Sequence, residues 1–448
     1  MQKISTLTRN TLMFPLALVL FEFSVYIAND MIQPGMLTVT REFGASAAWM
    51  ASAMTAFLVG GAIFQWLFGP LSDRIGRRPV MLGGTIFFIL ACLATLFSQS
   101  IESFIVLRVL QGMGLCFISS VGYAVVQEAF EEKAAIRVTA LMANVALIAP
   151  LIGPVAGAFM IEVLPWRMVF VFIAAIAFIA LIGLARHMPE TVKQRKEKLP
   201  LMQIWHDYRA VVGNRHFLKA AMCMPLLAIP LIGWIAMSPE ILVADGHLSV
   251  IEYGYWQIPV FACLIAGNLV LARQVDRWRL GSSIKLAMYP IAVGILIMLL
   301  GAAFLDKPYF LVAAISVIAF GEGLSAAVMI RFTLTESAVS KATVAATMGM
   351  INMTLYGVGI ELYKVFYLYA GMLGFALFSL AVIALYWYLS RSVVARAIRN
   401  SRLRELGCAL LESLCWNGAA MVEFKRSDRN GEFYLMEINP KLWGSLDL

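Results

Sequence analysis

The sequence predicts an all-α membrane protein whose twelve transmembrane helices form two bundles of six, followed by a short soluble segment. Of the 448 residues, 61% are hydrophobic and 14% are charged, with a mean hydropathy of +0.82, whereas a soluble domain carries about 25% charged residues. Apolar runs of about 20 residues, each long enough to cross a ~30 Å bilayer as a helix, recur from Thr11 to about Ser390. A polar connection at 189–215 separates the first six runs from the last six.

The apolar runs define the expected helices in order along the chain. In the first half they cover 11–36, 47–69, 79–98, 102–126, 136–161 and 166–186. In the second half they cover 218–243, 253–273, 284–304, 308–330, 342–364 and 369–390. The first run is too long and too rich in acids for a cleaved signal peptide. We therefore expect an N-terminal bundle at 1–188, a linker at 189–215, a C-terminal bundle at 216–392 and a soluble tail at 393–448.

The basic residues gather in alternate connections, which predicts the orientation in the membrane. One set of connections holds Arg74, Arg77, Arg78, Lys193, Arg195, Lys196, Lys198, Arg209, Arg215, Arg277 and Arg279. The opposite connections are nearly bare, with Arg41 and Lys307 the main exceptions. Positively charged loops stay in the cytoplasm, so we expect an inner-membrane protein with both termini cytoplasmic. The net charge of +8 then reflects these loops, and we expect no nucleic-acid partner.

The sequence gives no sign of a cofactor, a metal site or an ATP-driven motor in the membrane region. The six cysteines show no metal-ligand spacing, and four of them lie in apolar runs, as small buried hydrophobic residues do. No Gly-Lys pair occurs, and hence no nucleotide-binding P-loop. We expect a carrier powered by an ion gradient rather than an enzyme.

Two acids, Glu22 and Asp30, lie inside the first apolar run. A carboxylate at the bilayer centre costs roughly 2.5–3.5 kcal/mol on insertion scales, and such residues usually border a water-filled path where they bind cations or protons. Eight residues separate the two acids, which places them about 80° apart around a helix and ~12 Å apart along it. Both can face one cavity at two levels. The alternative for each is a permanently protonated, hydrogen-bonded structural carboxyl.

Arg108 opens the fourth run in the string Leu107-Arg108-Val-Leu-Gln111-Gly112. It lies about two turns from the outer end of its helix, at a depth similar to that of Asp30. A buried guanidinium needs a carboxylate or water nearby, so we expect Arg108 close to Asp30. A structural ion pair without a role in coupling is the alternative.

The connection after the second run, Gly69-Pro-Leu-Ser-Asp73-Arg74-Ile-Gly76-Arg77-Arg78, predicts a conformational latch. Glycines permit a tight turn, and Asp73 can pair with arginines such as Arg74 or Arg78, or lie at a helix end, differently in each conformation. The alternative, a solvated basic loop, would explain the arginines but not Asp73 or the glycines and the proline.

Prolines and glycines interrupt the fifth run at Pro150, Gly153, Pro154 and Gly157. Proline removes backbone donors and glycine permits close helix contact, so we expect a bent element that moves or seals. In the tenth run, Glu322 between Gly321 and Gly323 is a third acid at mid-membrane depth. It is either a coupling or substrate group of the second half or a buried structural carboxylate.

The composition changes from about Arg391 onward. A helix-like stretch to Trp416 precedes two β-like runs, Ala420–Lys425 and Phe433–Ile438, which a turn-forming segment separates. This soluble sequence is too short for a stable core alone.

These motifs together resemble the major facilitator superfamily, specifically its twelve-helix drug–proton antiporters. The superfamily resemblance rests on the 69–78 loop, on Arg108 with Gln111-Gly112, and on the interrupted fifth helix. Two further strings resemble a multidrug facilitator of this superfamily: Glu22 with Tyr26 to Met36, and Ala140 to Pro150. The likeness covers about residues 10–390. It implies that Glu22 and Asp30 are the proton and drug acids with Arg108 as their partner, that Asp73 is the cytoplasmic latch, and that the substrate pocket includes Tyr26, Asn29, Met54, Tyr123 and Met142.

The tail resembles instead the last strands of an ATP-grasp ligase. In that family the residues matching Glu423, Glu437 and Asn439 help to hold Mg²⁺–ATP, while Lys441 stands where an arginine is usual. The nucleotide-binding lobes that should precede these strands are absent, so we interpret the tail as a fragment without its own activity.

The sequence therefore predicts a monomeric proton-coupled antiporter that exports lipophilic cations and neutral drugs such as chloramphenicol across the lipid bilayer by alternating access. A narrow-specificity metabolite exporter or uniporter is the alternative within the fold. A transporter fused to an ATP-using ligase domain is the alternative from another class.

Overall fold

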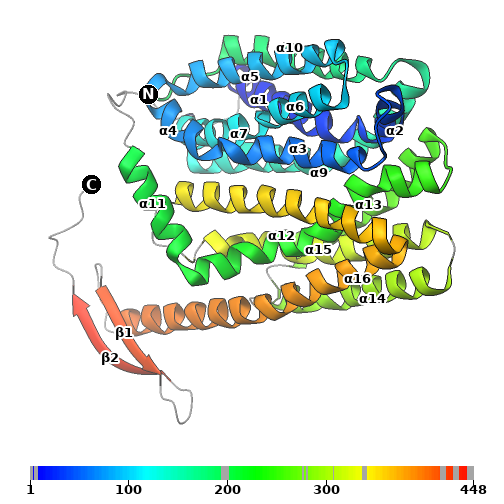
Figure 1. Cartoon of the computed structure of the whole chain (residues 1–448). Helices are drawn as coiled ribbons and strands as arrows, with labels where there is room; N and C mark the ends of the chain where they lie inside the picture. The colour runs from blue at the N-terminus through cyan, green and yellow to red at the C-terminus, as the bar shows by residue number, and fades with distance from the viewer. Residues whose placement is uncertain are drawn as a thin grey trace. The chain divides into compact units, whose positions relative to one another are not determined.

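The computed structural model describes residues 4, 9–192, 201–274, 277–278, 281–305, 307–334, 336, 341–413, 420–426 and 433–440. The basic residues of the linker between 193 and 200, and the end of the tail with Lys441, lie outside this part. The chain divides into two compact units, Met1–Ser390 and Arg391–Leu448. The first unit is a set of long, side-by-side helices (Figure 1).

The first half contains ten α-helices, α1 to α10, together with short 3-10 and π segments, in the described residues. They are α1 (Arg9–Asp30), η1 (Gln33–Gly35), α2 (Met36–Glu42), α3 (Trp49–Ile63), α4 (Gln65–Ile75), α5 (Arg77–Ala94), η2 (Thr95–Phe97), α6 (Ile101–Gly112), α7 (Gly114–Phe117), η3 (Ile118–Gly122), α8 (Tyr123–Ala129), α9 (Glu132–Val163) and α10 (Arg167–His187). The segments from α6 to α8 follow one another within a single span, Ile101–Ala129.

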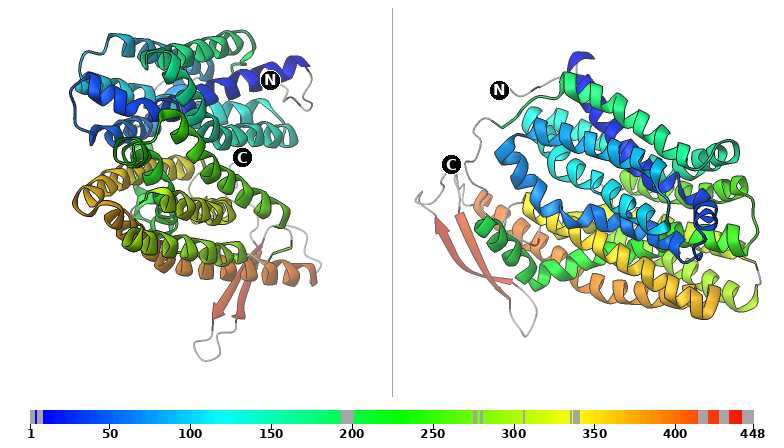
Figure 2. Two further views of the ribbon diagram at one scale, coloured as in Figure 1. Left: turned by 90° about the vertical axis from the view of Figure 1, so that its right-hand side faces the viewer. Right: turned by 45° about the horizontal axis from the view of Figure 1, so that its top comes forward.

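The second half begins with the linker helix α11. Its elements are α11 (Leu201–Gly213), α12 (Arg215–Ser238), the π segment η4 (Pro239–Asp245), α13 (Val250–Gln274), α14 (Ser282–Phe304), α15 (Tyr309–Leu334) and α16 (Lys341–Ser413). Figure 2 shows these helices grouped apart from those of the first half.

Helices cover all twelve of the expected apolar runs. In the described residues, ten helices are long and apolar enough to cross a membrane, and eleven if the pair α3 and α4, bent by 43°, is one span. The last of them, α16, holds non-helical backbone at Ala370 and Gly371, where Gly371 has a positive φ of 53°. That break falls at the start of the twelfth run (369–390), so α16 contains both the eleventh run and the twelfth. The all-α membrane fold is confirmed.

Close backbone contacts hold each half together. A Cβ on Gly60 of α3 would overlap the Val109 carbonyl of α6, and one on Gly112 would overlap the Phe57 carbonyl. In the second half a Cβ on Gly267 of α13 would overlap the Phe320 carbonyl of α15. Small residues let helices approach closely in lipid, where the hydrophobic effect adds little between helices. The corresponding helix pairs of the two halves are therefore packed in the same way.

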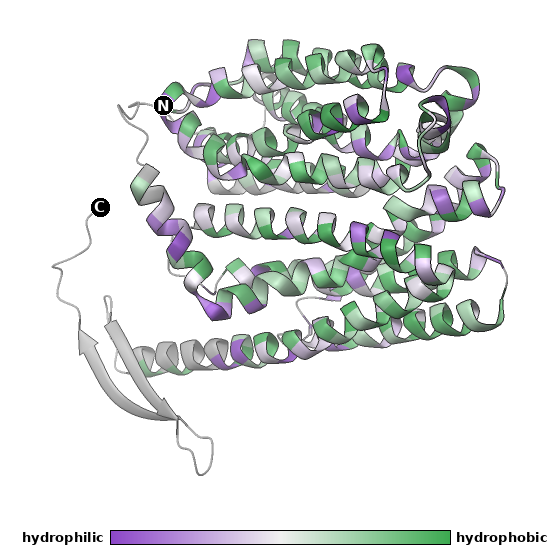
Figure 3. Ribbon diagram, viewed as in Figure 1, coloured by the Kyte–Doolittle hydropathy of each residue, from purple (hydrophilic) through white to green (hydrophobic). Residues whose placement is uncertain are grey.

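Polar residues are concentrated near the helix ends and on α11, while apolar residues cover the long helices (Figure 3). In α11 the apolar side chains of Met202 and Trp205 are 81% and 65% exposed. A short helix with exposed apolar residues and polar neighbours suits the membrane interface.

The second unit contains two antiparallel strands, β1 (Ala420–Arg426) and β2 (Phe433–Pro440). Their register pairs Ala420 with Pro440 and Arg426 with Phe433, with an irregularity between Glu423 and Phe424. The two β-like runs of the sequence are thus confirmed as strands. The unit boundary falls within α16.

Candidate functional site

Glu22 lies in the middle of α1, completely removed from solvent. The Tyr123 hydroxyl of α8 donates a hydrogen bond to its Oε1 at 3.4 Å. Its Oε2 is buried and has no hydrogen-bond partner in the described structure. A buried oxygen without a donor is costly, so Glu22 has unused capacity to bind a proton or a cationic group.

Asn29 links Arg108 to Asp30. Its Oδ1 accepts a hydrogen bond from Nη2 of Arg108 at 3.1 Å, and its Nδ2 donates to Oδ1 of Asp30 at 3.0 Å. Asn29 and Asp30 are 8% and 4% exposed, and Arg108 is fully buried. The amide therefore connects a buried cation to a buried acid.

The sequence predicted Arg108 close to Asp30; Arg108 lies within electrostatic range of that acid, and Asn29 bridges the two. Among the described ion pairs, Arg108 and Asp30 do not form one. Arg108 and Asp30 do lie at a similar level along α1, because Arg108 also donates a hydrogen bond to the carbonyl of Ala28, two residues before Asp30, at 2.8 Å. However, successive helical residues point about 100° apart, and it is Asn29 rather than Asp30 that meets the guanidinium.

Arg108 is held by two further contacts, with Gln111 and with Phe57. It donates to Gln111 Oε1 at 2.9 Å, and Gln111 in turn donates to Thr95 Oγ1 at 2.9 Å. The Phe57 ring lies under the guanidinium, 4.8 Å from ring centroid to Cζ. A planar guanidinium stacks well on an aromatic face. The spacing of Arg108 and Gln111 thus reflects a fixed orientation of the cation.

The interrupted fifth run lies against the acid-bearing end of α1. A Cβ on Gly153 of α9 would lie 2.7 Å from Cβ of Asp30, and one on Gly157 would overlap the Met31 carbonyl. Pro150 and Pro154 lie within the same helix. The neighbour that the glycines were expected to contact is therefore α1, at Asp30.

The structure gathers some of the expected pocket residues around the acids. Tyr26 is half-buried and lies within electrostatic range of Glu22, Asp30, Tyr123 and Tyr356. Tyr356 belongs to α16, in the second half, and was not predicted from the sequence. A single tyrosine in an apolar run does not by itself indicate a place near the acids.

The two methionines expected in the pocket are buried. Met54 is 2% exposed and Met142 is fully buried, with Met142 in the core of the first half. No described polar contact joins either of them to Glu22 or Asp30.

Arg77 is the centre of the latch region, where the sequence favoured Arg74 and Arg78. It pairs with Asp73 at 2.7 Å and with Glu128 of α8 at 2.8 Å, and it also bonds the Gly69 carbonyl at 3.3 Å. Arg74 is exposed, and Arg78 donates to the Ala185 carbonyl. Five donors in a rigid fork let one arginine bind several oxygens. Arg77 is therefore a residue to be added to the predicted latch.

Glu190 completes this cluster at the start of α5. Its carboxylate accepts from the backbone N–H groups of Arg77 at 3.0 Å and Arg78 at 3.2 Å. Carboxylates stabilise helix N-termini. The turn depends on Gly76, whose φ is 118°. Glu128 and Glu190 lie 51 and 113 residues from Arg77, so no local pattern of residues indicated their part in this cluster.

Glu322 lies in the middle of α15 and is 7% exposed. Its Oε2 has no hydrogen-bond partner in the described structure. Tyr356 and Tyr386 lie within its electrostatic range. Tyr356 therefore lies within electrostatic range of Tyr26 in the first half and of Glu322 in the second half.

A second charged cluster joins the halves at the opposite end of the bent span from Arg77. Ser52 of α3 donates to Glu361 at 3.0 Å and accepts from Lys364 at 2.8 Å, and Lys364 pairs with Glu361. Glu361 and Lys364 belong to α16. The sequence alone suggested nothing for these residues beyond a place near a helix end.

No group of three or more His, Cys, Asp or Glu residues able to hold a metal occurs in the part of the chain that the structure describes.

Comparison with known proteins identifies the family. Residues 18–363 match the model of the Major Facilitator Superfamily. The chain is 52% identical over 375 residues to the multidrug transporter MdfA of Yersinia pestis bv. Antiqua (strain Angola), covering 84% of this chain and 92% of that protein. It is 50% identical over the same length to MdfA of Escherichia coli O157:H7, with the same coverage. It is 47% identical over 398 residues to MdfA of Edwardsiella piscicida, covering 89% and 96%.

Solved structures share the fold at low sequence identity. A bacterial homologue of the human lysosomal transporter Spinster, inward-facing and unoccupied, superposes with a TM-score of 0.66 at 14% identity, covering 87% of this chain and 99% of that one. The Escherichia coli xylose transporter XylE, partially occluded and inward open, gives 0.63 at 12% identity, covering 85% and 98%.

Proposed function

Since this chain belongs to the major facilitator superfamily, we propose that it is a proton-coupled multidrug antiporter that exports lipophilic cations and neutral drugs such as chloramphenicol by alternating access. It is a multi-pass transport protein of a bacterial inner membrane rather than an enzyme. The observation that carries the proposal is the pair of buried acids on α1, Glu22 and Asp30, with different surroundings. Relatives of about half identical sequence are named multidrug transporters.

In this proposal Asp30 is the coupling acid. The amide of Asn29 connects it to Arg108, and a buried cation held at fixed distance favours release of a proton from the acid. Binding of a drug or opening to the outside changes this contact, so the proton is exchanged at a defined step. Gly153, packed on Asp30, makes α9 the element that moves with it.

Glu22 is the acid that recognises cationic drugs. Its free oxygen provides a partner for a positive centre, and Tyr26 and Tyr123 offer flat, polarisable faces of the kind that bind varied apolar molecules. Met54 and Met142 supply adaptable packing around the pocket. Neutral drugs bind to the same aromatic and methionine surface without the charge. Glu322 is a further acid that serves the second half.

The remaining elements follow the alternating-access scheme. The latch of Gly69, Asp73, Arg74, Arg77 and Arg78 closes the cytoplasmic side in one conformation and opens in the other. Both termini are cytoplasmic, and one chain forms the functional unit. These assignments rest on the basic loops and on the family.

A proton gradient is sufficient to drive this exchange. One charge moving across 100 mV supplies about 2.3 kcal/mol, and one pH unit supplies about 1.4 kcal/mol. One proton can therefore support a drug concentration ratio of tens to hundreds.

Transport in proteoliposomes tests the proposal. Under an imposed pH gradient the wild-type protein should concentrate a lipophilic cationic dye and chloramphenicol, and Asp30→Asn should abolish uphill movement of both. Glu22→Gln should reduce movement of the dye much more than that of chloramphenicol. Addition of drug to the detergent-solubilised wild type should release protons, and Asp30→Asn should release none. Uphill export by Asp30→Asn would remove Asp30 from the coupling step.

Substrate range separates this proposal from a narrow exporter or uniporter of the same fold. Several chemically unrelated drugs should compete with one another for transport. Competition by a single compound class alone would favour the narrow carrier.

We further propose that the 393–448 segment is an appended ATP-grasp fragment without catalytic activity. Its support is the sequence likeness around Glu423, Glu437 and Asn439. Purified protein should neither bind nor hydrolyse Mg-ATP. Hydrolysis that is lost in Glu437→Ala would instead support a bifunctional fusion.

A further inference from the structure

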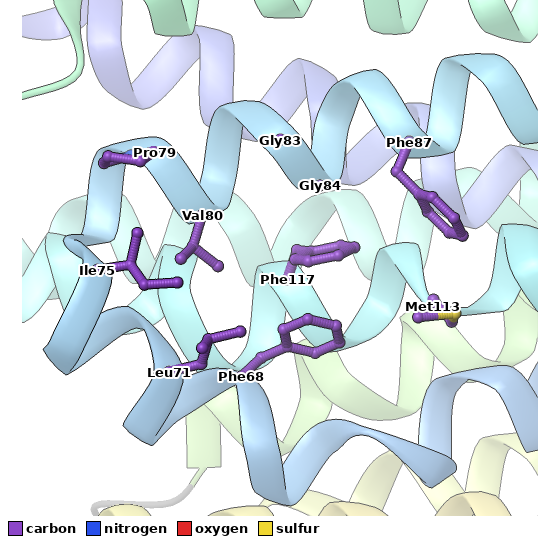
Figure 4. Close-up of a pocket in the computed structure, with 10 residues that line it drawn as sticks. All are labelled: Phe68, Leu71, Ile75, Pro79, Val80, Gly83, Gly84, Phe87, Met113 and Phe117. Atoms are coloured by element: carbon purple, nitrogen blue, oxygen red, sulfur yellow. The ribbon is translucent and has the colours of Figure 1, made fainter. Parts of the chain in front are cut away.

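An apolar pocket of about 350 Å³ lies between α4, α5 and the segment that begins at Met113 (Figure 4). The ten residues that line it are neither polar nor charged, so the pocket offers no group that recognises a charge or exchanges a proton. Buried polar side chains to which the proposed function gives no role lie instead in the second half, on α12 and α13.

A chain of hydrogen bonds connects α12 to α13 in the interior of the second half. The Trp234 indole N–H donates to Oε1 of Gln257 at 3.0 Å, and Nε2 of Gln257 donates to Oγ of Ser238 at 3.3 Å. The hydroxyl oxygens of Ser238 and Tyr253 are 3.2 Å apart, and either group can donate. On each helix the two residues lie four positions apart and therefore on one face. All four are at most 1% exposed, so these bonds form out of contact with water.

The indole of Trp234 fixes the direction of this chain as far as Ser238. An indole donates and does not accept, so Gln257 presents its oxygen to Trp234 and its NH₂ group to Ser238. Ser238 has one hydrogen and two acceptors within reach, the Ile235 carbonyl at 3.3 Å and the oxygen of Tyr253. When Ser238 donates to Ile235, Tyr253 donates to Ser238. When Ser238 donates to Tyr253, the hydrogen of Tyr253 is free for another acceptor.

Tyr253 lies at the contact between the halves, near Asp30. A Cβ on Gly153 of α9 would lie 2.7 Å from Cβ of Asp30, and one on Gly254 of α13 would lie 3.6 Å from the carbonyl oxygen of Pro154. Consecutive residues of α9 therefore contact Asp30 on one side and the neighbour of Tyr253 on the other. Tyr253 lies within electrostatic range of Asp30, although none of the described hydrogen bonds joins them.

We infer that Tyr253 is the hydrogen-bond donor that the second half supplies to ionised Asp30. When Asp30 loses its proton, the Tyr253 hydroxyl turns its hydrogen from Ser238 to the carboxylate, and Ser238 turns its own hydrogen to Tyr253. No hydrogen changes its oxygen, because only two hydroxyl groups rotate. A donor to a carboxylate favours the charged form, and such a bond is about twice as strong as a neutral one.

The bond joins the ionisation of Asp30 to the arrangement of the two halves. Hydrogen bonds between oxygens need a separation of about 2.5–3.0 Å, so this one exists only where α13 approaches α9 closely enough. Other ionisable groups near Asp30 in the described structure, Arg108 and Tyr26, belong to the first half. The α9 residues at this contact carry no ionisable group; they are Gly153, Pro154, Val155 and Ala158.

A titration of Asp30 tests the inference. Full-length protein in detergent is followed by infrared spectroscopy at the carbonyl band of protonated carboxyl groups, and the part of the signal that is missing in Asp30→Asn reports on Asp30. Tyr253→Phe removes one hydroxyl and keeps the ring. Ionised Asp30 then loses a donor, so the midpoint of its titration should rise by about one pH unit. Tyr255→Phe, on the same helix and 53% exposed, should leave the midpoint unchanged.

Equal midpoints in Tyr253→Phe and the wild type would overturn the inference, and so would an Asp30 that titrates in neither protein. A Tyr253→Phe protein that melts at a lower temperature with an unshifted midpoint would make Tyr253 a packing residue only. The inference rests on the proposed role of Asp30 as the coupling acid, but the titration needs no transport. Uphill export by Asp30→Asn would therefore remove the proposed function and leave the titration to decide on Tyr253, whereas an unshifted midpoint would remove only this partner.

Discussion

At the scale of single residues, the site depends on an amide that holds two ionisable groups apart. Asn29 accepts from Arg108 and donates to Asp30, which suits the two ends of its side chain: an oxygen for the cation and an NH₂ for the carboxylate. A direct ion pair would be harder to break, because separating two buried charges is costly. The amide lets Arg108 influence Asp30 and still leaves the acid free to exchange a proton.

Asn29→Leu should therefore uncouple the site. It removes both hydrogen bonds, so Arg108 and Asp30 each lose a buried partner, and we expect a loss of about 1–3 kcal/mol in the free energy of unfolding. Uphill drug movement should fall more than drug binding, since the proton step is affected. Thermal unfolding and proteoliposome transport measure the two effects.

Ser24→Ala is the matched control on the same helix. Ser24 is equally buried but bonds only the Phe21 carbonyl within its own helix. It should change neither stability nor transport by a measurable amount. An Asn29→Leu protein that exports drug as the wild type does would show that the amide bridge is dispensable.

At the scale of helices, two charged clusters lie at opposite ends of the bent span formed by α3 and α4. The Arg77 cluster joins α4, α5 and α8, all within the first half. The Ser52 cluster joins α3 to α16, and so connects the two halves. The Arg77 cluster stabilises the turn between α4 and α5, whereas the Ser52 cluster depends on how the two halves are arranged.

Arg77→Met should destabilise the turn between α4 and α5. It removes the cation shared by Asp73 and Glu128, whose side chains are 31% and 38% exposed, so solvent moderates the loss to about 1–2 kcal/mol. Thermal unfolding should show this decrease, and Arg77→Lys should restore only part of it because lysine lacks the bidentate fork. Arg41→Met, an exposed arginine at another helix end, should have no such effect.

Lys364→Met should favour separation of the halves at the Ser52 end. The contact is partly exposed, and such a pair is worth up to about 1 kcal/mol, or about fivefold in a two-state equilibrium. Pulsed EPR between spin labels at Ser46 and Tyr369, both exposed, should show more of the long-distance population.

Lys285→Met removes an exposed lysine remote in sequence from this cluster and should leave that distance distribution unchanged. An unchanged distribution in Lys364→Met as well would mean that the cluster does not influence the arrangement of the halves.

At the scale of the whole molecule, the membrane unit and the tail are separate in composition and in compactness. The family model ends at residue 363, and the first compact unit ends at Ser390. The described tail strands pair with each other. Transport should therefore reside in the helices before the tail.

Ending the chain after Arg399 should preserve drug export. This keeps the last apolar span, Thr343–Arg399, with its buried Val393 and Val394, and removes both strands. Initial export rates in vesicles, normalised to the amount of folded protein, should match those of the full chain within twofold. A large loss of rate in a well-folded truncated protein would assign the tail a role in transport.

The sequence by itself determined the number and order of the membrane helices, the polar connection at 189–215 and the depth of Glu22, Asp30 and Arg108. These are local properties, because a span is defined by about 20 consecutive apolar residues and depth follows from 1.5 Å per residue. It also placed both strands of the tail, whose alternation and turn are local signals.

Only the tertiary structure decided which polar groups meet. Asn29 rather than Asp30 contacts Arg108, Arg77 rather than Arg74 organises the latch, and Ser52 reaches a carboxylate 309 residues away. These contacts depend on the rotation of each helix and on backbone approach at glycines such as Gly153 and Gly112. In lipid every long apolar helix satisfies its own backbone, so a helix can adopt many rotations until packing selects one.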